Sequence, residues 1–130
     1  MSNRLLLAIA AVTLVTTSIN AEVPSFKKVV LDANIGDVCY AVTSADVNDD
    51  GQPDAVAISE NEVVWYQNPN WTRHSMIKDA VPKDHVCIAA HDIDGDGLVD
   101  FALGAGWPKN GGTIHWLRRG ETLNEPWQVF

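Results

Sequence analysis

Short apolar segments rich in β-branched and aromatic residues recur along the chain, separated by clusters of Asn, Asp, Gly and Pro. Such segments are typical of β-strands, and the residues between them are typical of turns. After the first 21 residues, no stretch keeps the apolar period of an amphipathic helix. The pattern therefore predicts an all-β chain, with strands near residues 26–31, 39–45, 55–59, 63–68, 71–77, 86–91, 101–105, 114–119 and 127–130.

These segments belong to an internal repeat. The acidic stretch 46–54 recurs 46 residues later as 92–100, and the apolar segments before and after the two stretches agree. Later in each copy Trp65 corresponds to Trp116, and Trp71 to Trp127. The repeat units predicted in this way span residues 26–70 and 71–126, with a third beginning at 127.

Four short strands in a unit of this length are the proportion of a β-propeller blade. The sequence therefore predicts two four-stranded blades, which are too few to close a propeller. Each blade buries a face on its neighbour, so two blades leave both ends of the stack uncovered. We expect either that further blades follow in a longer chain or that several copies associate.

The two acidic stretches place oxygen-bearing side chains at positions 1, 3, 5 and 9 around a glycine at position 6. Hard oxygen ligands around a sharp glycine turn are typical of a calcium-binding loop, in which position 7 offers its backbone carbonyl. This predicts two Ca²⁺ sites, one formed by Asp46, Asn48, Asp50, Gln52 and Asp54, the other by Asp92, Asp94, Asp96, Leu98 and Asp100.

Two alternatives to such sites suit part of the pattern. An EF-hand requires a bidentate Glu at position 12 and flanking helices, whereas position 12 here is Ala57 or Leu103 and the flanks are strand-like. A pair of Asx turns without metal also suits the residues, because Asp and Asn bond to nearby backbone N–H groups. The repetition of all nine positions in two loops favours the metal.

The stretches "DVNDDGQPDAVAI", "HDIDGDGLVDFALG" and "VVWYQNPNW" resemble FG-GAP or VCBS-type repeats, the blades of integrin-alpha-like propellers and of many secreted bacterial proteins. The resemblance covers about residues 26–130. It implies a β-propeller with calcium in loops between blade strands, held by the side chains at positions 1, 3, 5 and 9 of each acidic stretch. Asn48 departs from the usual Asp, which lowers the charge of the first loop.

The N-terminus has the order of a secretory signal peptide: Arg4, an apolar run, then small and polar residues, with cleavage predicted after Ala21. This predicts a secreted or periplasmic protein with no membrane span after cleavage. The remaining chain has 8 basic and 17 acidic side chains, hence a net charge of −9. Such a surface repels phosphate backbones, so nucleic acid is excluded as a partner.

The two cysteines, Cys39 and Cys87, suit either a disulfide or two buried free thiols. The four tryptophans that recur in the repeat are expected to pack between or within blades. Trp107 has no counterpart in the first copy, and its glycine-rich loop is a candidate surface for binding sugar or protein.

No nucleophile, zinc or phosphate-loop motif occurs in the sequence. His74, His85, His91 and His115 are interpreted as strand or turn residues rather than catalytic ones. The favoured function is a secreted, non-catalytic, calcium-binding module for recognition or adhesion, with an unidentified protein or polysaccharide ligand. The alternative is part of a propeller-based carbohydrate-active enzyme, a lyase or dehydratase.

Overall fold

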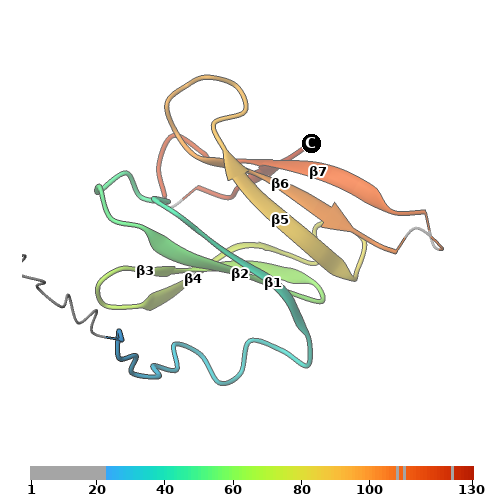
Figure 1. The fold of residues 1–130 in the computed structure, drawn as a ribbon. Helices are drawn as coiled ribbons and strands as arrows, with labels where there is room; N and C mark the ends of the chain where they lie inside the picture. The colour runs from blue at the N-terminus through green and yellow to red at the C-terminus, as the bar shows by residue number, and fades with distance from the viewer. Residues whose placement is uncertain (1–22, 108, 110, 124) are drawn as a thin grey trace, which may run out of the picture.

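The computed structural model describes residues 23–107, 109, 111–123 and 125–130, so the predicted signal peptide lies outside the described residues. The described chain forms two four-stranded antiparallel sheets (Figure 1). The first sheet contains β1 (Cys39–Ala45), β2 (Asp54–Ser59), β3 (Glu62–Gln67) and β4 (Thr72–Lys78), and the second contains β5 (His85–His91), β6 (Asp100–Ala105), β7 (Thr113–Arg118) and β8 (Gln128–Val129). The prediction of an all-β chain with two four-stranded units is confirmed.

Each sheet is a meander in which strands adjacent in sequence pair with each other. The pairing repeats in detail: Val56 lies opposite Trp65 in the first sheet, and Ala102 lies opposite Trp116 in the second. The first strand of each sheet also has its register shift at the same place, between Cys39 and Ala41 and again between His85 and Cys87. A residue in the first sheet therefore corresponds to the residue 46 positions later, as far as the end of β6.

The sheets are offset by one strand from the repeat units read in the sequence. The segment after Trp71 forms β4, the last strand of the first sheet, although it begins the second sequence unit. In the same way, Gln128 and Val129 pair with β7 and complete the second sheet. Each sheet therefore joins three segments of one sequence unit to the first segment of the next.

The two sheets stack front to back. We call the face of the first sheet that carries Val56 and Ile58 its front face, and the face that carries Ala55 and Ala57 its back face. Phe101 and Leu103 in the second sheet correspond in position to Ala55 and Ala57, so they lie on its back face. The front face of the first sheet packs on this back face. The shared core holds Val47, Val56, Ile58, Val63, Trp65, Met76, Ile77, Phe101, Leu103, Leu117 and Trp127. Front-to-back stacking is the arrangement of blades in a propeller, although the described residues do not form a closed ring.

The strand expected at residues 26–31 is absent, because strand pairing in the described chain begins only at Cys39. Instead, the segment before β1 runs along the back face of the first sheet, on the side away from the second sheet (Figure 1). Leu31 and Ile35 pack there against Ala57 and Tyr66. A strand at this position would need the edge of a preceding sheet to pair with, and the described chain provides none.

Polar contacts hold this N-terminal segment in place. The Tyr66 hydroxyl donates to Asp32 at 2.7 Å, and Arg73 Nε lies 3.5 Å from the same carboxylate. Burial, followed by the hydrogen bond to Asp32, raises the pKa of Tyr66 to about 12. The segment therefore covers one of the two ends that the sequence predicted to be open.

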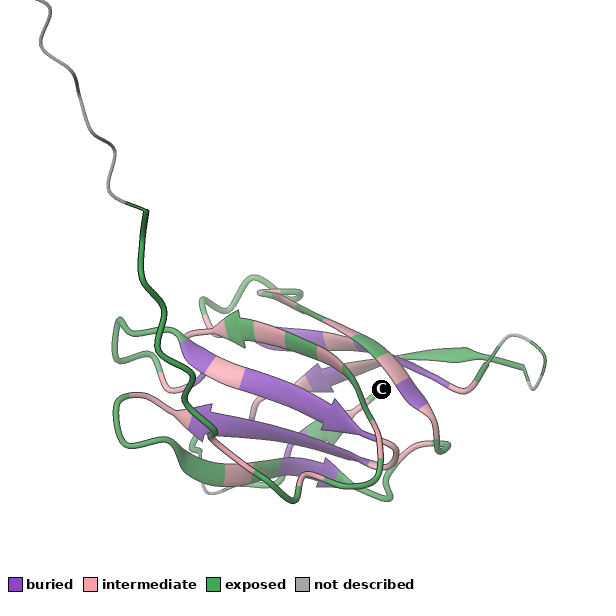
Figure 2. Cartoon of the chain, turned by 60° about the horizontal axis from the view of Figure 1, so that its bottom comes forward, coloured by how far each residue is buried: buried purple, intermediate pink, exposed green. Residues whose placement is uncertain are grey.

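The front face of the second sheet is the other end, and nothing described covers it. Ile114 is 75% exposed there, whereas Val63, which has the same place in the first sheet, is 0% exposed. Trp116 packs on the exposed Phe130, with ring centroids 4.9 Å apart. In the first sheet, β2 and β3 are buried along nearly their whole length, and strands of this sheet are largely purple in Figure 2. This end fits the prediction of an uncovered apolar face.

The cysteines do not form a disulfide. Cys39 and Cys87 are free thiols, as one interpretation held, but both are exposed, so their expected burial is wrong. They cannot pair within the chain because Cys39 borders the back face of the first sheet and Cys87 lies opposite Gly104 on the front face of the second. The two faces are separated by both sheets.

The tryptophans mostly behave as expected. Trp65 and Trp127 are buried in the shared core, but Trp71 is 37% exposed, so its predicted packing role is wrong. Trp107 is exposed as predicted, and its ring meets Tyr40 edge-on at a centroid distance of 5.6 Å.

Within the part of the chain that is described, no helix has the length and apolarity to cross a bilayer.

Candidate metal-binding loops

The two acidic stretches connect the first and second strands of each sheet. The first loop, residues 46–54, joins β1 to β2, and the second loop, residues 92–100, joins β5 to β6. Gly51 and Gly97 have φ values of 83° and 88°, which explains the need for glycine at position 6. Position 4 is also left-handed, with Asp49 in the first loop and Gly95 in the second. The sequence had not singled out position 4.

The side chains at positions 1, 3 and 5 share most of their bonds to the loop backbone, and Asp92 accepts one more, from the Gly95 N–H at 2.7 Å. Asp46 accepts from the N–H groups of positions 5 and 6 at 3.0 and 2.7 Å, and Asp92 does so at 3.1 and 3.0 Å. Position 3 accepts from the N–H of position 5, and position 5 accepts from that of position 7. The two loops therefore have closely similar conformations, and these bonds are of the Asx-turn kind that the sequence offered as the alternative to a metal site.

Position 9 distinguishes the loops. Asp54 and Asp100 each begin the second strand of their sheet, and each is only 1% exposed. Both oxygens of Asp54 are satisfied, by the N–H of Val47 at 3.0 Å and that of Asn68 at 2.8 Å. Asp100 accepts from the N–H of Ile93 at 3.1 Å through Oδ2, but its buried Oδ1 has no partner among the described residues.

The two loops differ in what the strand after position 9 donates. Asn68 donates its backbone N–H to Asp54 Oδ1, but Arg119, at the corresponding place, makes no such bond to Asp100 Oδ1. The Arg119 guanidinium Nη1 donates to the Val47 carbonyl in the first loop at 2.7 Å. Arg119 thus ties the second sheet to the first loop. The buried oxygen of Asp100 is left as a free acceptor, which is costly unless a cation or water supplies the missing contact.

Three carboxylates of the second loop lie close together. Asp92, Asp94 and Asp100 each offer an oxygen within 4.8 Å of the others. Hard carboxylate oxygens at such spacing, in a group that includes the aspartate with the unpartnered oxygen, fit a calcium ion. Asp96 adds a fourth carboxylate at the exposed side of the loop. The second loop therefore brings three of its predicted ligands together, and the calcium site itself stays a prediction.

The first loop is less well suited to a cation. Asn48 replaces the carboxylate at position 3, and its Nδ2 donates to Asp50 Oδ2 at 2.8 Å. Asp54 already has two hydrogen bonds, so this loop contains no buried carboxylate oxygen without a partner among the residues described. At position 7 the N–H groups of Gln52 and Leu98 donate to Asp50 and Asp96. The role of the position 7 carbonyls stays a prediction.

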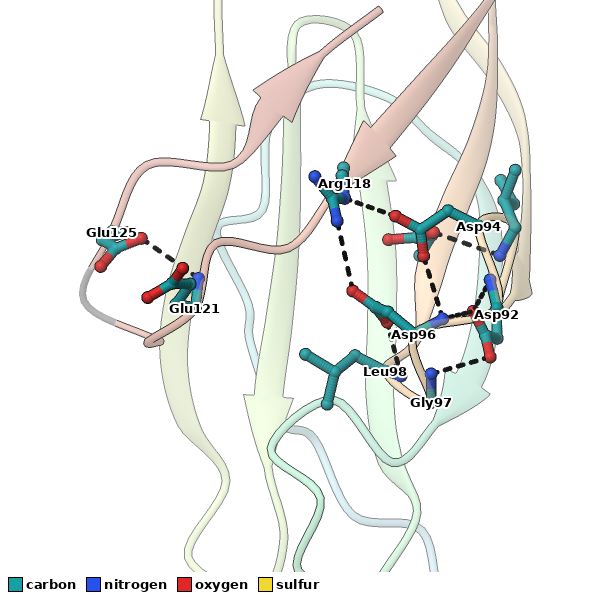
Figure 3. Close-up of polar contacts among 11 residues, drawn as sticks. Asp92, Asp94, Asp96, Gly97, Leu98, Arg118, Glu121 and Glu125 are labelled. Carbon is teal, nitrogen blue, oxygen red and sulfur yellow. Dashed lines mark hydrogen bonds and ion pairs between the residues drawn. The ribbon is translucent and has the colours of Figure 1, made fainter.

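One residue of the second loop's surroundings was missed by sequence reasoning. Arg118, at the end of β7, places its guanidinium over the loop (Figure 3). Its Nε lies 2.6 Å from Asp94 Oδ2, and its Nη2 lies 3.5 Å from Asp96 Oδ2. The corresponding residue in the first sheet is Gln67. The alignment of "VVWYQN" with "IHWLRR" contained this difference.

The four histidines have separate environments. His74 stacks on Trp65 with ring centroids 4.3 Å apart, and His115 Nε2 lies 2.8 Å from the Thr113 hydroxyl. His91 is exposed at the end of β5. His85 is fully buried, and burial lowers its pKa below the usual range.

Comparison with known proteins gives one match. Residues 46–103 match the family model described as an FG-GAP-like repeat. The matched segment begins at the first residue of the first loop, contains the second loop and ends within β6, which is somewhat less than half of the chain. No curated protein and no solved structure matches the chain. The match supports the predicted FG-GAP relationship for the part of the chain that contains both loops.

Proposed function

Because the FG-GAP-like segment contains both acidic loops, we propose that the protein is a calcium-binding repeat module whose loops are stabilised by the bound ion. The observation that carries this proposal is Asp100, a member of a group of three close carboxylates, whose buried Oδ1 has no partner among the described residues. A divalent cation satisfies that oxygen and offsets the repulsion between the carboxylates.

The ligands in the second loop are the side chains of Asp92, Asp94, Asp96 and Asp100 with the Leu98 carbonyl. In the first loop they are the corresponding positions, namely Asp46, Asn48, Asp50, Asp54 and the Gln52 carbonyl. Bound calcium supplies positive charge and cross-links the ends of a loop that joins two strands. The unfolded chain has no assembled site, so binding stabilises the fold.

We further propose that the module serves recognition or adhesion in a secreted protein, as the order of its N-terminal residues suggests. The open front face of the second sheet supports a role in assembly. The same face of the first sheet is buried by a second-sheet back face, so an equivalent sheet is the partner of matching shape. Such a sheet can come from a further repeat or from another copy of the chain.

Isothermal titration of calcium into the chain from Glu22 onward tests the metal proposal. Wild-type protein should bind calcium, and magnesium should bind more weakly because it demands stricter geometry. Asp50→Ala and Asp96→Ala should each remove binding at one loop, and the double variant should remove both. Asp37→Ala, which removes an exposed carboxylate outside the loops, is the control. Undiminished heat in the double variant would refute the assignment.

Incubation with a panel of polysaccharides tests the recognition role. Binding without release of product supports a recognition module. Calcium-dependent formation of product would instead support the alternative of a carbohydrate-active enzyme.

A further inference from the structure

Arg118 reaches the second loop from a different strand. Its guanidinium contacts Asp94 and Asp96, which hold positions 3 and 5 of the loop (Figure 3). The Nε atom, 2.6 Å from Asp94 Oδ2, is not aligned for a hydrogen bond, so the contact is mainly one of opposite charges. The pair is partly shielded from solvent, since the arginine side chain is 38% exposed and the Asp94 side chain 21%.

The loop does not need this arginine in order to fold. The first loop forms the same backbone hydrogen bonds at positions 1, 3 and 5, although Gln67 stands where Arg118 stands in the second sheet. A merely structural role for Arg118 within the loop is therefore not required. The loops do differ in the negative charge at their ligand positions. The second loop carries more of it, which favours a positively charged side chain beside that loop.

All four side-chain ligand positions of the second loop carry a carboxylate, whereas the first loop has Asn48 at position 3. Without an ion, like charges at this spacing repel one another. Arg118 offsets part of that repulsion, and it does so at every ordinary pH because the guanidinium does not lose its proton. The contact is made to two of the residues that calcium would use.

From this arrangement we propose that Arg118 is a tethered cation that competes with calcium for Asp94 and Asp96 and so lowers the calcium affinity of the second loop. This inference rests on the proposed function. The Arg118 guanidinium also has other acidic partners nearby, because Glu121 and Glu125 line the same 240 Å³ hollow as Arg118 and Asp96. Calcium binding would then move the guanidinium from the aspartates toward these glutamates.

Calcium titration of matched variants tests the proposal. In full-length chains that carry Asp50→Ala, so that the second loop is titrated alone, Arg118→Gln introduces the residue found at the first loop's equivalent position. It should tighten calcium binding about tenfold, the size of effect expected for one charge removed from a partly solvated site. Lys83→Gln is the control, because it removes a positive charge paired with Glu60 at the far end of β5.

Two further measurements separate competition from simple loss of structure. Gln67→Arg in an Asp96→Ala chain places an arginine beside the first loop and should weaken calcium binding there. In EDTA, Arg118→Gln should lower the unfolding temperature relative to Lys83→Gln, because the carboxylates lose their countercharge. With saturating calcium this deficit should disappear.

The possible results have distinct meanings. Equal or weaker calcium binding in the Arg118→Gln chain, while the second loop still binds, overturns the competition and leaves the proposed function in place. Absence of calcium binding from wild type and from every variant overturns the proposed function, and the competition with it. Tighter binding in Arg118→Gln together with no change in Lys83→Gln supports the proposal.

Discussion

The two buried aspartates at position 9 should respond differently to truncation when calcium is removed. Asp54→Ala deprives two backbone N–H groups, those of Val47 and Asn68, of their acceptor. A hydrogen bond to a charged group contributes about 1.5–3 kcal/mol to stability. Losing two of them should therefore cost about 3–6 kcal/mol of the free energy of unfolding.

Asp100→Ala should cost less without calcium. It removes one such bond, from the N–H of Ile93, and it also removes a buried oxygen that has no partner among the described residues. The lost bond costs about 1.5–3 kcal/mol, and relief of the desolvated oxygen offsets part of that. The expected difference between the two variants is thus about 2 kcal/mol or more, with Asp54→Ala the less stable.

Urea denaturation in EDTA, followed by tryptophan fluorescence, measures this difference. Asp54→Asn and Asp100→Asn are the matched controls, because each keeps one acceptor oxygen at nearly the same volume. Adding calcium should stabilise wild type and Asp54→Ala through the second loop, but should stabilise Asp100→Ala less. Equal losses for the two alanine variants in EDTA, or a larger loss for Asp100→Ala, would refute the assignment of the unpartnered oxygen.

Three other predictions concern parts of the chain outside the loops. Because burial lowers the pKa of His85, its ring is neutral in the fold; stability is complete above the unfolded-state pKa of about 6.5 and falls as the pH drops below it. The unfolding temperature of His85→Leu should therefore fall less between pH 7 and pH 5 than that of wild type, and an equal fall would contradict this. Ile114→Asp, at an exposed position, should reduce concentration-dependent association in light scattering without lowering the unfolding temperature; unchanged association would argue against the open face as an interface. Mass spectrometry of protein from a secreting host should show an N-terminus at Glu22, and a product beginning at Met1 would count against export.

The strands were predictable because the sequence contains the pattern twice. A short apolar run is ambiguous alone, but the register of two copies around the acidic loops located β1, β2, β3 and β5, β6, β7 together. The ends of these strands were predictable because the turns between them require Asp and Gly at particular positions. The sharp turn in each acidic loop followed in the same way, since Gly51 and Gly97 adopt positive φ.

What the sequence did not predict depends on contacts between distant residues. Residues 26–31 have the composition of a strand, but pairing needs a neighbouring edge, and the chain packs Leu31 and Ile35 on a sheet face instead. The grouping of strands into sheets was likewise offset, because periodicity identifies a repeat and not where one sheet ends. Arg118 and the unpartnered oxygen of Asp100 became visible only once β7 was placed beside the second loop.

A crystal structure of the protein grown with calcium, with the ion identified by its anomalous scattering, tests the central claim most directly. The account predicts an ion in the second loop bound by the carboxylates of Asp92, Asp94, Asp96 and Asp100, with the Asp100 Oδ1 atom among its ligands. Arg118 should then have left Asp94 and Asp96. A second loop that holds only water at saturating calcium, with Arg118 still on the two aspartates, would contradict it.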